Sequence, residues 1–170
     1  MTKTRWIPDV RSLATAIAGS LALGALLGLP LGPQTLGRMA VTFPLVLFGV
    51  AITCAPALLI GGSLTDSGFK LDSAVRALGA GLQATGYALL GFVPVALFLA
   101  CTGETGVRGV MPTFGLIATA VLLGLVRVWG ALGVAREARS RMIPLFLGWS
   151  VVSLGIGTIL LARAIEGGLS

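Results

Sequence analysis

The chain has little of what a soluble enzyme uses. Its 170 residues include no histidine, and Asp and Glu together number only 6. Charged residues make up 11% of the chain, against about 25% in ordinary soluble domains. Histidine is the commonest general acid–base and a frequent zinc ligand. Its absence and the shortage of carboxylates argue against an ordinary hydrolase and against a zinc enzyme, and we expect no cofactor.

The few carboxylates fall outside the apolar stretches of the sequence. They are Asp9, Asp66, Asp72, Glu104, Glu137 and Glu166. Proton relays and cation-coupled transporters usually keep an ionisable group at membrane depth, and none of these carboxylates is predicted to lie there. The serines and threonines of the apolar stretches have no base nearby and are predicted to hydrogen-bond between helices.

The two cysteines, Cys54 and Cys101, also indicate no special chemistry. Cys54 lies inside one apolar run and Cys101 ends another, so a disulfide would have to join two different depths. We expect both to be packing residues.

What the sequence does contain is apolar. Hydrophobic residues make up 56% of it, and the mean hydropathy is +1.01. Residues 41–62, VTFPLVLFGVAITCAPALLIGG, carry no charge, and a bilayer core requires about 20 such residues in a helix. Five segments meet this requirement: Leu13–Leu31, Met39–Gly62, Ala77–Cys101, Val110–Trp129 and Met142–Ala162.

These segments predict an all-α, polytopic integral membrane protein, a bundle of five transmembrane helices in one domain. Residues 1–12 would form a cytoplasmic N-terminal segment, 13–162 the transmembrane domain and 163–170 a short tail. Lys3, Arg5 and Arg11 before the first segment could also begin a signal peptide. A retained span is favoured, because the run continues through LPLGPQ without a small-residue cleavage pattern.

The basic residues predict the orientation. With five spans, one side carries Lys3, Arg5, Arg11, Lys70, Arg76, Arg136, Arg139 and Arg141, with Arg127 near the same end, and the other carries Arg38, Arg108 and Arg163. Lys and Arg prefer the cytoplasmic side, so the N-terminus would be cytoplasmic and the C-terminus outside, in a membrane we expect to be the bacterial inner membrane. The net charge of +6 is dispersed rather than clustered, so no nucleic-acid partner is expected.

Small residues recur every four positions in the first segment, at Ser12, Ala16, Ser20, Gly24, Gly28 and Gly32, and again at Ala77, Gly81 and Thr85 in the third. Such rows allow another helix backbone to approach closely. Ser20, Gly24, Gly28 and Gly81 are therefore candidate helix-packing residues. Packing within the bundle is favoured over a dimer seam, because five helices need such contacts among themselves.

A second set of residues marks candidate pore or polar contacts. Pro56 and Pro94 are predicted to kink the second and third helices, and kinked neighbours can enclose a cavity. Gln83 and Arg127 are polar residues within spans; Gln83 is expected to bond a neighbouring helix, and Arg127 to snorkel to the headgroups. Arg136, Arg139 and Arg141 are expected to contact lipid headgroups, with an acidic protein partner as the alternative.

Residues 58–99, LLIGGSLTDSGFKLDSAVRALGAGLQATGYALLGFVPVALFL, have a Gly-Gly pair, a loop with Ser and Phe, and then a span with Tyr and Pro. In this pattern the chain resembles the Yip1-like five-span membrane protein family, over residues 40–162. The resemblance implies five spans, a cytoplasmic N-terminus and a scaffold or membrane-organising role.

The predicted function is that of a non-enzymatic scaffold or accessory subunit of a membrane complex. It would act by helix–helix packing, with membrane lipids and other membrane protein subunits, or further copies of itself, as partners. The alternative is a small channel or transporter with its pore near the kinked second and third helices. A membrane enzyme for lipid or isoprenoid substrates is a third, weaker hypothesis.

Overall fold

The computed structural model describes residues 10–64, 71–102, 107–132 and 136–169. Within these ranges the chain forms helices and no strand. The long helices are α1 (Val10–Gly28), α2 (Pro33–Leu64), α3 (Leu71–Thr102), α4 (Val107–Ala131) and α5 (Arg136–Leu169), with a short 3₁₀ turn η1 at Leu29–Leu31. All five are long and apolar enough to cross a membrane. The prediction of an all-helical chain with five such segments is confirmed.

Several helices extend beyond the predicted apolar segments. α2 begins at Pro33, ahead of Met39, and α5 continues to Leu169, through most of the segment predicted to be a tail. Hydropathy reports which residues suit a membrane core, whereas a helix ends where backbone propensity or geometry stops it. The residues Ala162 to Leu169 include good helix formers, which carry α5 onward.

A tight turn joins α1 and α2. Gly32 has a φ of 109°, a conformation that glycine adopts without strain. Its N–H donates to the Leu29 carbonyl at 3.3 Å, and its own carbonyl accepts from Thr35 N–H at 3.1 Å. The two helices therefore run antiparallel.

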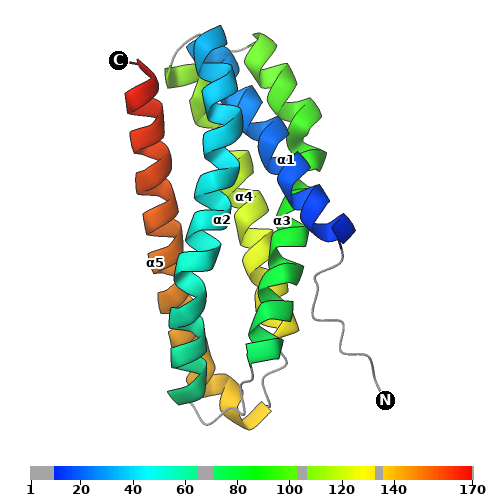
Figure 1. The fold of residues 1–170 in the computed structure, drawn as a ribbon, viewed down its shortest axis with the longest axis vertical. Coiled ribbons are helices and arrows are strands. Elements are labelled where there is room, and N and C mark those ends of the chain that lie inside the picture. Colours follow the sequence, from blue (N-terminus) through cyan, green and yellow to red (C-terminus); the bar gives the residue numbers. More distant parts are fainter. Residues whose placement is uncertain (1–9, 65–70, 103–106, 133–135, 170) are drawn as a thin grey trace.

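The long helices alternate in direction (Figure 1). One end of the bundle carries the α1–α2 turn, the last turn of α3, the first turn of α4 and the last turn of α5. The other end carries the last turn of α2, the first turn of α3, the last turn of α4 and the first turn of α5. We call these the C-terminal end and the hairpin end of the bundle.

α1 is the most enclosed helix, and α5 the least. In the apolar window of α1, 39% of the residues are buried, against 17% in α5. α1 packs against both α2 and α3, α4 packs on α3, and α5 packs on α2. α1 therefore lies between α2 and α3 and joins them near the C-terminal end of the bundle.

Glycines let α1 approach its two neighbours at backbone distance. A Cβ added at Gly24 would lie 2.6 Å from the Met39 carbonyl oxygen of α2, and one at Gly19 would lie 2.5 Å from the Gly86 carbonyl oxygen of α3. A Cβ at Gly28 would collide with Leu36. The small-residue row of α1 therefore packs within the bundle.

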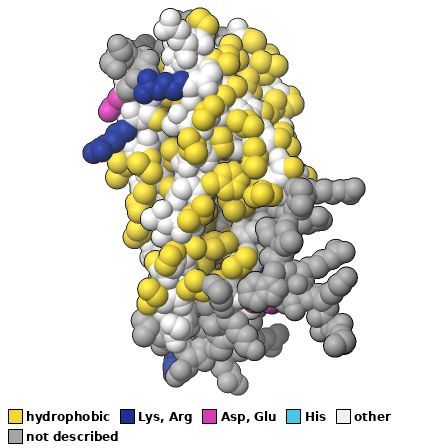
Figure 2. Space-filling model, in the orientation of Figure 1, with side chains coloured by type: hydrophobic (Ala, Val, Ile, Leu, Met, Phe, Trp, Pro, Cys, Tyr) yellow, Lys and Arg dark blue, Asp and Glu magenta, His cyan; other side chains and the backbone are white. Residues whose placement is uncertain are grey.

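The buried side chains form two separate clusters. The larger, near the C-terminal end, includes Leu23, Leu27, Phe43, Leu89 and Leu161. The smaller, toward the hairpin end, consists of Leu58, Ala77, Val128, Leu132 and Phe146. Outside them the surface is apolar as well: in Figure 2 hydrophobic side chains cover the middle of the visible face, and the Lys and Arg side chains coloured there lie toward its ends.

Alanine substitutions at two glycines test the role of close approach. Gly24→Ala meets backbone atoms of α2, and overpacking of this kind costs about 1–3 kcal/mol. Gly37→Ala is the matched control, because an added Cβ there meets nothing within 4 Å and alanine gains up to about 1 kcal/mol in helix propensity. We expect opposite changes in the free energy of unfolding, measured by denaturant titration in detergent. Equal effects would contradict the packing described for Gly24.

Candidate functional site

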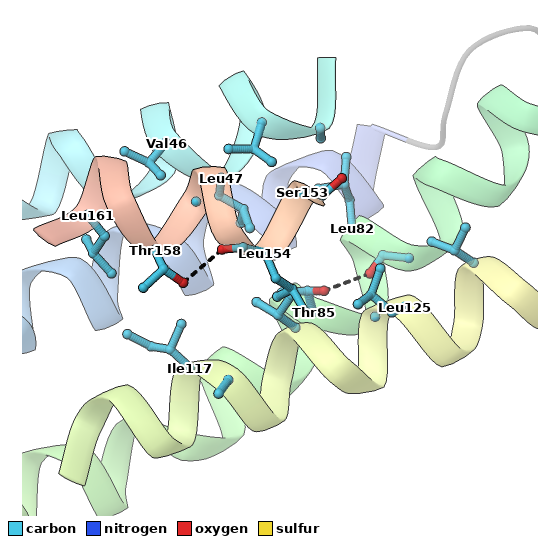
Figure 3. Close-up of a pocket in the computed structure, with 18 of the residues that line it drawn as sticks. Val46, Leu47, Leu82, Thr85, Ile117, Leu125, Ser153, Leu154, Thr158 and Leu161 are labelled. Carbon is cyan, nitrogen blue, oxygen red and sulfur yellow. Dashed lines mark hydrogen bonds between the residues drawn. The ribbon is translucent and has the colours of Figure 1, made fainter. Parts of the chain in front are cut away.

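A half-enclosed cavity of about 210 Å³ lies between α2, α3, α4 and α5. It separates the two buried clusters: Phe43, Ile117 and Leu161 belong to the larger one and Val128 to the smaller, and all four line the cavity. Figure 3 shows side chains from the four helices converging on this space, among them Leu47, Leu82, Ile117 and Leu154. The helix α1 contributes no residue to the lining.

The spacing of the lining residues follows from helical periodicity. On α3 the cavity is lined by Leu78, Gly81, Leu82 and Thr85, positions three or four apart that share one helix face. Gly81 also sets the distance to α4, because a Cβ there would collide with Val128 and lie 3.1 Å from the Gly124 carbonyl oxygen. α3 and α4 are therefore in backbone contact along one wall of the cavity.

The polar side-chain groups of the lining are three hydroxyls and the indole N–H of Trp149. Thr85 donates to the Gly81 carbonyl at 3.0 Å, and Thr158 donates to the Leu154 carbonyl at 2.8 Å (Figure 3). Both are bonded within their own helices. Ser153 is only 9% exposed, and its hydroxyl has no hydrogen-bond partner; the same is true of the buried Ser150 hydroxyl near it on α5. The lining carries no charged side chain.

An aromatic group lies toward the hairpin end, and its member Trp149 belongs to the cavity lining. The ring centroids of Trp129 and Phe146 are 5.0 Å apart, and those of Phe146 and Trp149 are 5.7 Å apart. The Trp149 indole N–H donates to the Cys54 carbonyl at 2.7 Å. Pro56 has no N–H, so the carbonyl that it leaves without a helical donor is that of Ile52, four residues earlier, and not that of Cys54. The Trp149 bond ties α5 to α2 two residues before this proline.

The open side of the cavity lies between α4 and α5. Of the lining residues only Ala118 of α4 and Thr158 of α5 are exposed. Apart from the ring contact of Trp129 with Phe146, the backbones of these two helices approach each other at few points. Ala118 and Thr158 therefore form the two lips of a lateral opening.

The chemistry of the lining decides what the cavity can hold. A buried water needs about two to four polar partners, and only the Ser153 hydroxyl offers an uncommitted group among the lining side chains. Apolar cavities of about 150 Å³ stay dry and accept benzene-sized molecules. The lining therefore suits an apolar occupant better than water.

The four residues predicted as pore or polar contacts do not line this cavity. Pro56, Pro94 and Arg127 are exposed, and Gln83 is half-buried one position beyond Leu82. α2 and α3 continue unbroken through their prolines. The Gln83 side chain makes no hydrogen bond with other residues in the part of the chain that the structure describes, so the expected bond to a neighbouring helix is not formed there.

The predicted packing residues, unlike the predicted pore residues, lie inside the bundle. Ser20, Gly24, Gly28 and Gly81 are all buried between helices, although the Ser20 hydroxyl bonds its own helix at the Ile17 carbonyl, 2.9 Å away. Among the predicted headgroup contacts, Arg141 is exposed near the start of α5. Arg136 and Arg139 lie in the first turn of α5, and their side chains are outside the described residues.

Comparison of the chain with protein-family models, with curated proteins and with solved structures gave no match. The described residues also contain no cluster of His, Cys, Asp or Glu that could hold a metal ion. The functional argument therefore depends on the shape and chemistry of the helices themselves.

Of the lining residues, the sequence singles out Gly81 and Thr85, as part of the small-residue row of the third segment, but it does not predict a cavity. The hydroxyls of Ser153 and Thr158 are predicted only to hydrogen-bond between helices. The sequence does hold one signal: Ser150, Ser153 and Gly157 recur at spacings of three and four, which marks one face of α5 as more polar and smaller than the other. That signal shows an inward face and not a cavity.

Replacement of Trp149 by phenylalanine tests the link between α5 and α2. The change removes the indole N–H and keeps an aromatic ring, so we expect a loss of about 0.5–1.5 kcal/mol in the free energy of unfolding. Denaturant titration in detergent measures it. Phe146→Leu serves as the comparison, because it disturbs the ring contacts and leaves the hydrogen bond intact. An unchanged Trp149→Phe variant would mean that the bond contributes nothing to stability.

Proposed function

We propose that the protein is an integral membrane protein that crosses the bilayer five times and acts as a scaffold or accessory subunit of a membrane complex. The proposal is supported by the five long apolar helices and by the small share of residues buried in α2, α3, α4 and α5. In water such wide apolar faces would aggregate. In a bilayer they contact lipid or the helices of other proteins.

The orientation follows the distribution of basic residues over the two ends of the bundle. The hairpin end carries Arg76, Arg127 and Arg141, whereas the C-terminal end carries Arg38 and Arg163. With the remaining basic residues assigned by sequence, the hairpin end holds the majority and is proposed to face the cytoplasm. The membrane would be the bacterial inner membrane, with the N-terminus cytoplasmic and the C-terminus outside, as the resemblance to Yip1-like proteins also implies.

The outer face of α5 is the observation that carries the scaffold proposal. The exposed residues Gly148, Val151, Val152, Gly155 and Ile159 all lie on the side of α5 opposite to the cavity. Val151 is 68% exposed, and a Cβ added at Gly148 or Gly155 meets nothing within 4 Å. The two glycines are two turns apart, so this face offers another helix a close approach between valine side chains.

The alternative of a small channel or transporter receives less support. The cavity lining has no charged side chain, whereas pores for ions present carbonyls or charged groups along their path. The weaker enzyme hypothesis would need positioned acid–base groups, and the hydroxyls of the cavity have none among their lining neighbours. Helix association in the membrane remains the function that the geometry favours.

Reporter fusions test the insertion and the orientation. A reporter fused after Ser170 should report the outside compartment, and one inserted at Ser140 the cytoplasm. Alkaline phosphatase and a fluorescent protein, active on opposite sides of the inner membrane, provide the two measurements. The reverse pair of results would overturn the orientation, and cytoplasmic signals at both positions would overturn the crossing of the membrane by α5.

Paired substitutions test α5 as the association surface. Gly148→Leu with Gly155→Leu should abolish stoichiometric association with a partner subunit or a second copy, measured by mass after gentle purification from native membranes. Because both positions are open and leucine gains up to about 1 kcal/mol per site over glycine in helix propensity, we expect the free energy of unfolding to stay the same or to rise.

The control pair is Gly115→Leu with Gly130→Leu on α4, where added side chains also meet open space. Association lost in the α5 pair and kept in the α4 pair supports the proposal. A wild-type protein that is purified alone as a monomer would contradict it. Association that survives the α5 substitutions would exclude this face.

A further inference from the structure

We propose that the cavity between α2, α3, α4 and α5 binds one hydrocarbon chain of a membrane lipid, which reaches it sideways between α4 and α5. The inference rests on the proposed insertion in a membrane. It goes beyond that function because it assigns a ligand class and a point of access to a defined internal site.

The depth of the opening selects the part of a lipid that can reach it. Ala118 lies seven residues after the start of the apolar segment Met111–Ala131, and Thr158 lies eight residues before the end of Ser140–Glu166. At a rise of 1.5 Å per residue, both residues lie roughly 10–12 Å inside the membrane span, measured from the C-terminal end of the bundle. The hydrocarbon core is about 30 Å thick, so the opening is at the depth of acyl chains and below the headgroups.

The interior suits a chain rather than a polar molecule. Phe43, Leu47, Ile117, Val121 and Leu161 supply apolar walls, and the hydroxyls of Thr85 and Thr158 are already bonded to their own helices. The space of about 210 Å³ exceeds the apolar cavities of about 150 Å³ that accept benzene. A segment of a flexible chain can fill such a space while the rest of the lipid stays in the bilayer.

The packing of α5 explains why a chain is needed. α5 is held at the hairpin end by the Trp149 hydrogen bond and the aromatic contacts, and it packs on α2. Toward the C-terminal end little direct contact joins it to α4. A lipid chain between Ala118 and Thr158 would complete the contact that the two helices lack.

The alternative occupant is a lipophilic molecule with an oxygen atom that accepts a hydrogen bond from Ser153. Its hydroxyl is more than nine-tenths buried and has no partner. Ser153→Ala separates the two occupants, because the substitution removes the hydroxyl and makes the site slightly more apolar. A hydrocarbon chain should bind this variant at least as well as the wild type.

The experiment uses the full chain in vesicles of phosphatidylcholine whose acyl chain carries a diazirine near its middle. After illumination, labelled residues are mapped by peptide mass spectrometry. In the wild type we expect label at the buried residues Ile117 and Thr85, which bulk lipid does not contact from outside. The exposed residue Val151 on the opposite side of α5 should be labelled in every variant and reports membrane insertion.

Ala118→Phe should abolish the label at Ile117 and Thr85, because it blocks one lip of the opening. Thr158→Phe blocks the other lip and gives an independent test. The matched control is Leu123→Phe, an exposed position of α4 outside the cavity lining. It should leave the interior label unchanged.

The outcomes distinguish this inference from the proposed function. Label at Val151 without label at Ile117 and Thr85 overturns the inference and leaves membrane insertion intact. Interior label that persists in both lip variants overturns the lateral access. Interior label that is lost in Ser153→Ala assigns the site to an oxygen-bearing ligand and overturns the hydrocarbon chain. Label at neither kind of position overturns insertion itself.

Discussion

The close approach of α1 to α2 and α3 is the constraint on which the rest of the bundle depends. In a bilayer, helices do not gain by hiding apolar surface from water, so their association relies on contact between closely packed atoms. Gly19, Gly24 and Gly28 remove the side chains that would keep the backbones apart. α1 can then pack between the longer helices α2 and α3 and set the distance between them.

The same rule explains how the outer helices are held. α4 meets α3 at a second glycine contact, Gly81 with Gly124, and this pair is tightly packed. α5 has no comparable contact with α4, and the nearest atom to a Cβ at its Gly157 would be the Val50 side chain of α2, at 3.8 Å. Its attachment relies more on the Trp149 hydrogen bond and the aromatic contacts. The cavity lies beside the α3–α4 contact, where α5 makes no such close approach to α4.

This arrangement links packing to the proposed function. The glycine rows pack inside the bundle, as the sequence analysis favoured, so any scaffold surface must lie elsewhere. The outer face of α5 is apolar, contains two open glycines and belongs to the least enclosed helix. The opposite face of the same helix borders the cavity. A lipid chain that fills the cavity would therefore also position the face proposed to meet a partner.

The sequence by itself determined the number of long helices, their apolar character and the small-residue face of α1. These follow from local properties, because the length of an uncharged run and a period of four residues can be read along one segment. Only the tertiary structure decided that Gly24 and Gly28 face α2 while Gly19 faces α3. It also decided that Thr85, Ser153 and Ala118 border one cavity, whereas Gln83 and Pro94 do not. Periodicity identifies the face of a helix, but the partner of that face and any space left between four helices depend on how all of them pack together.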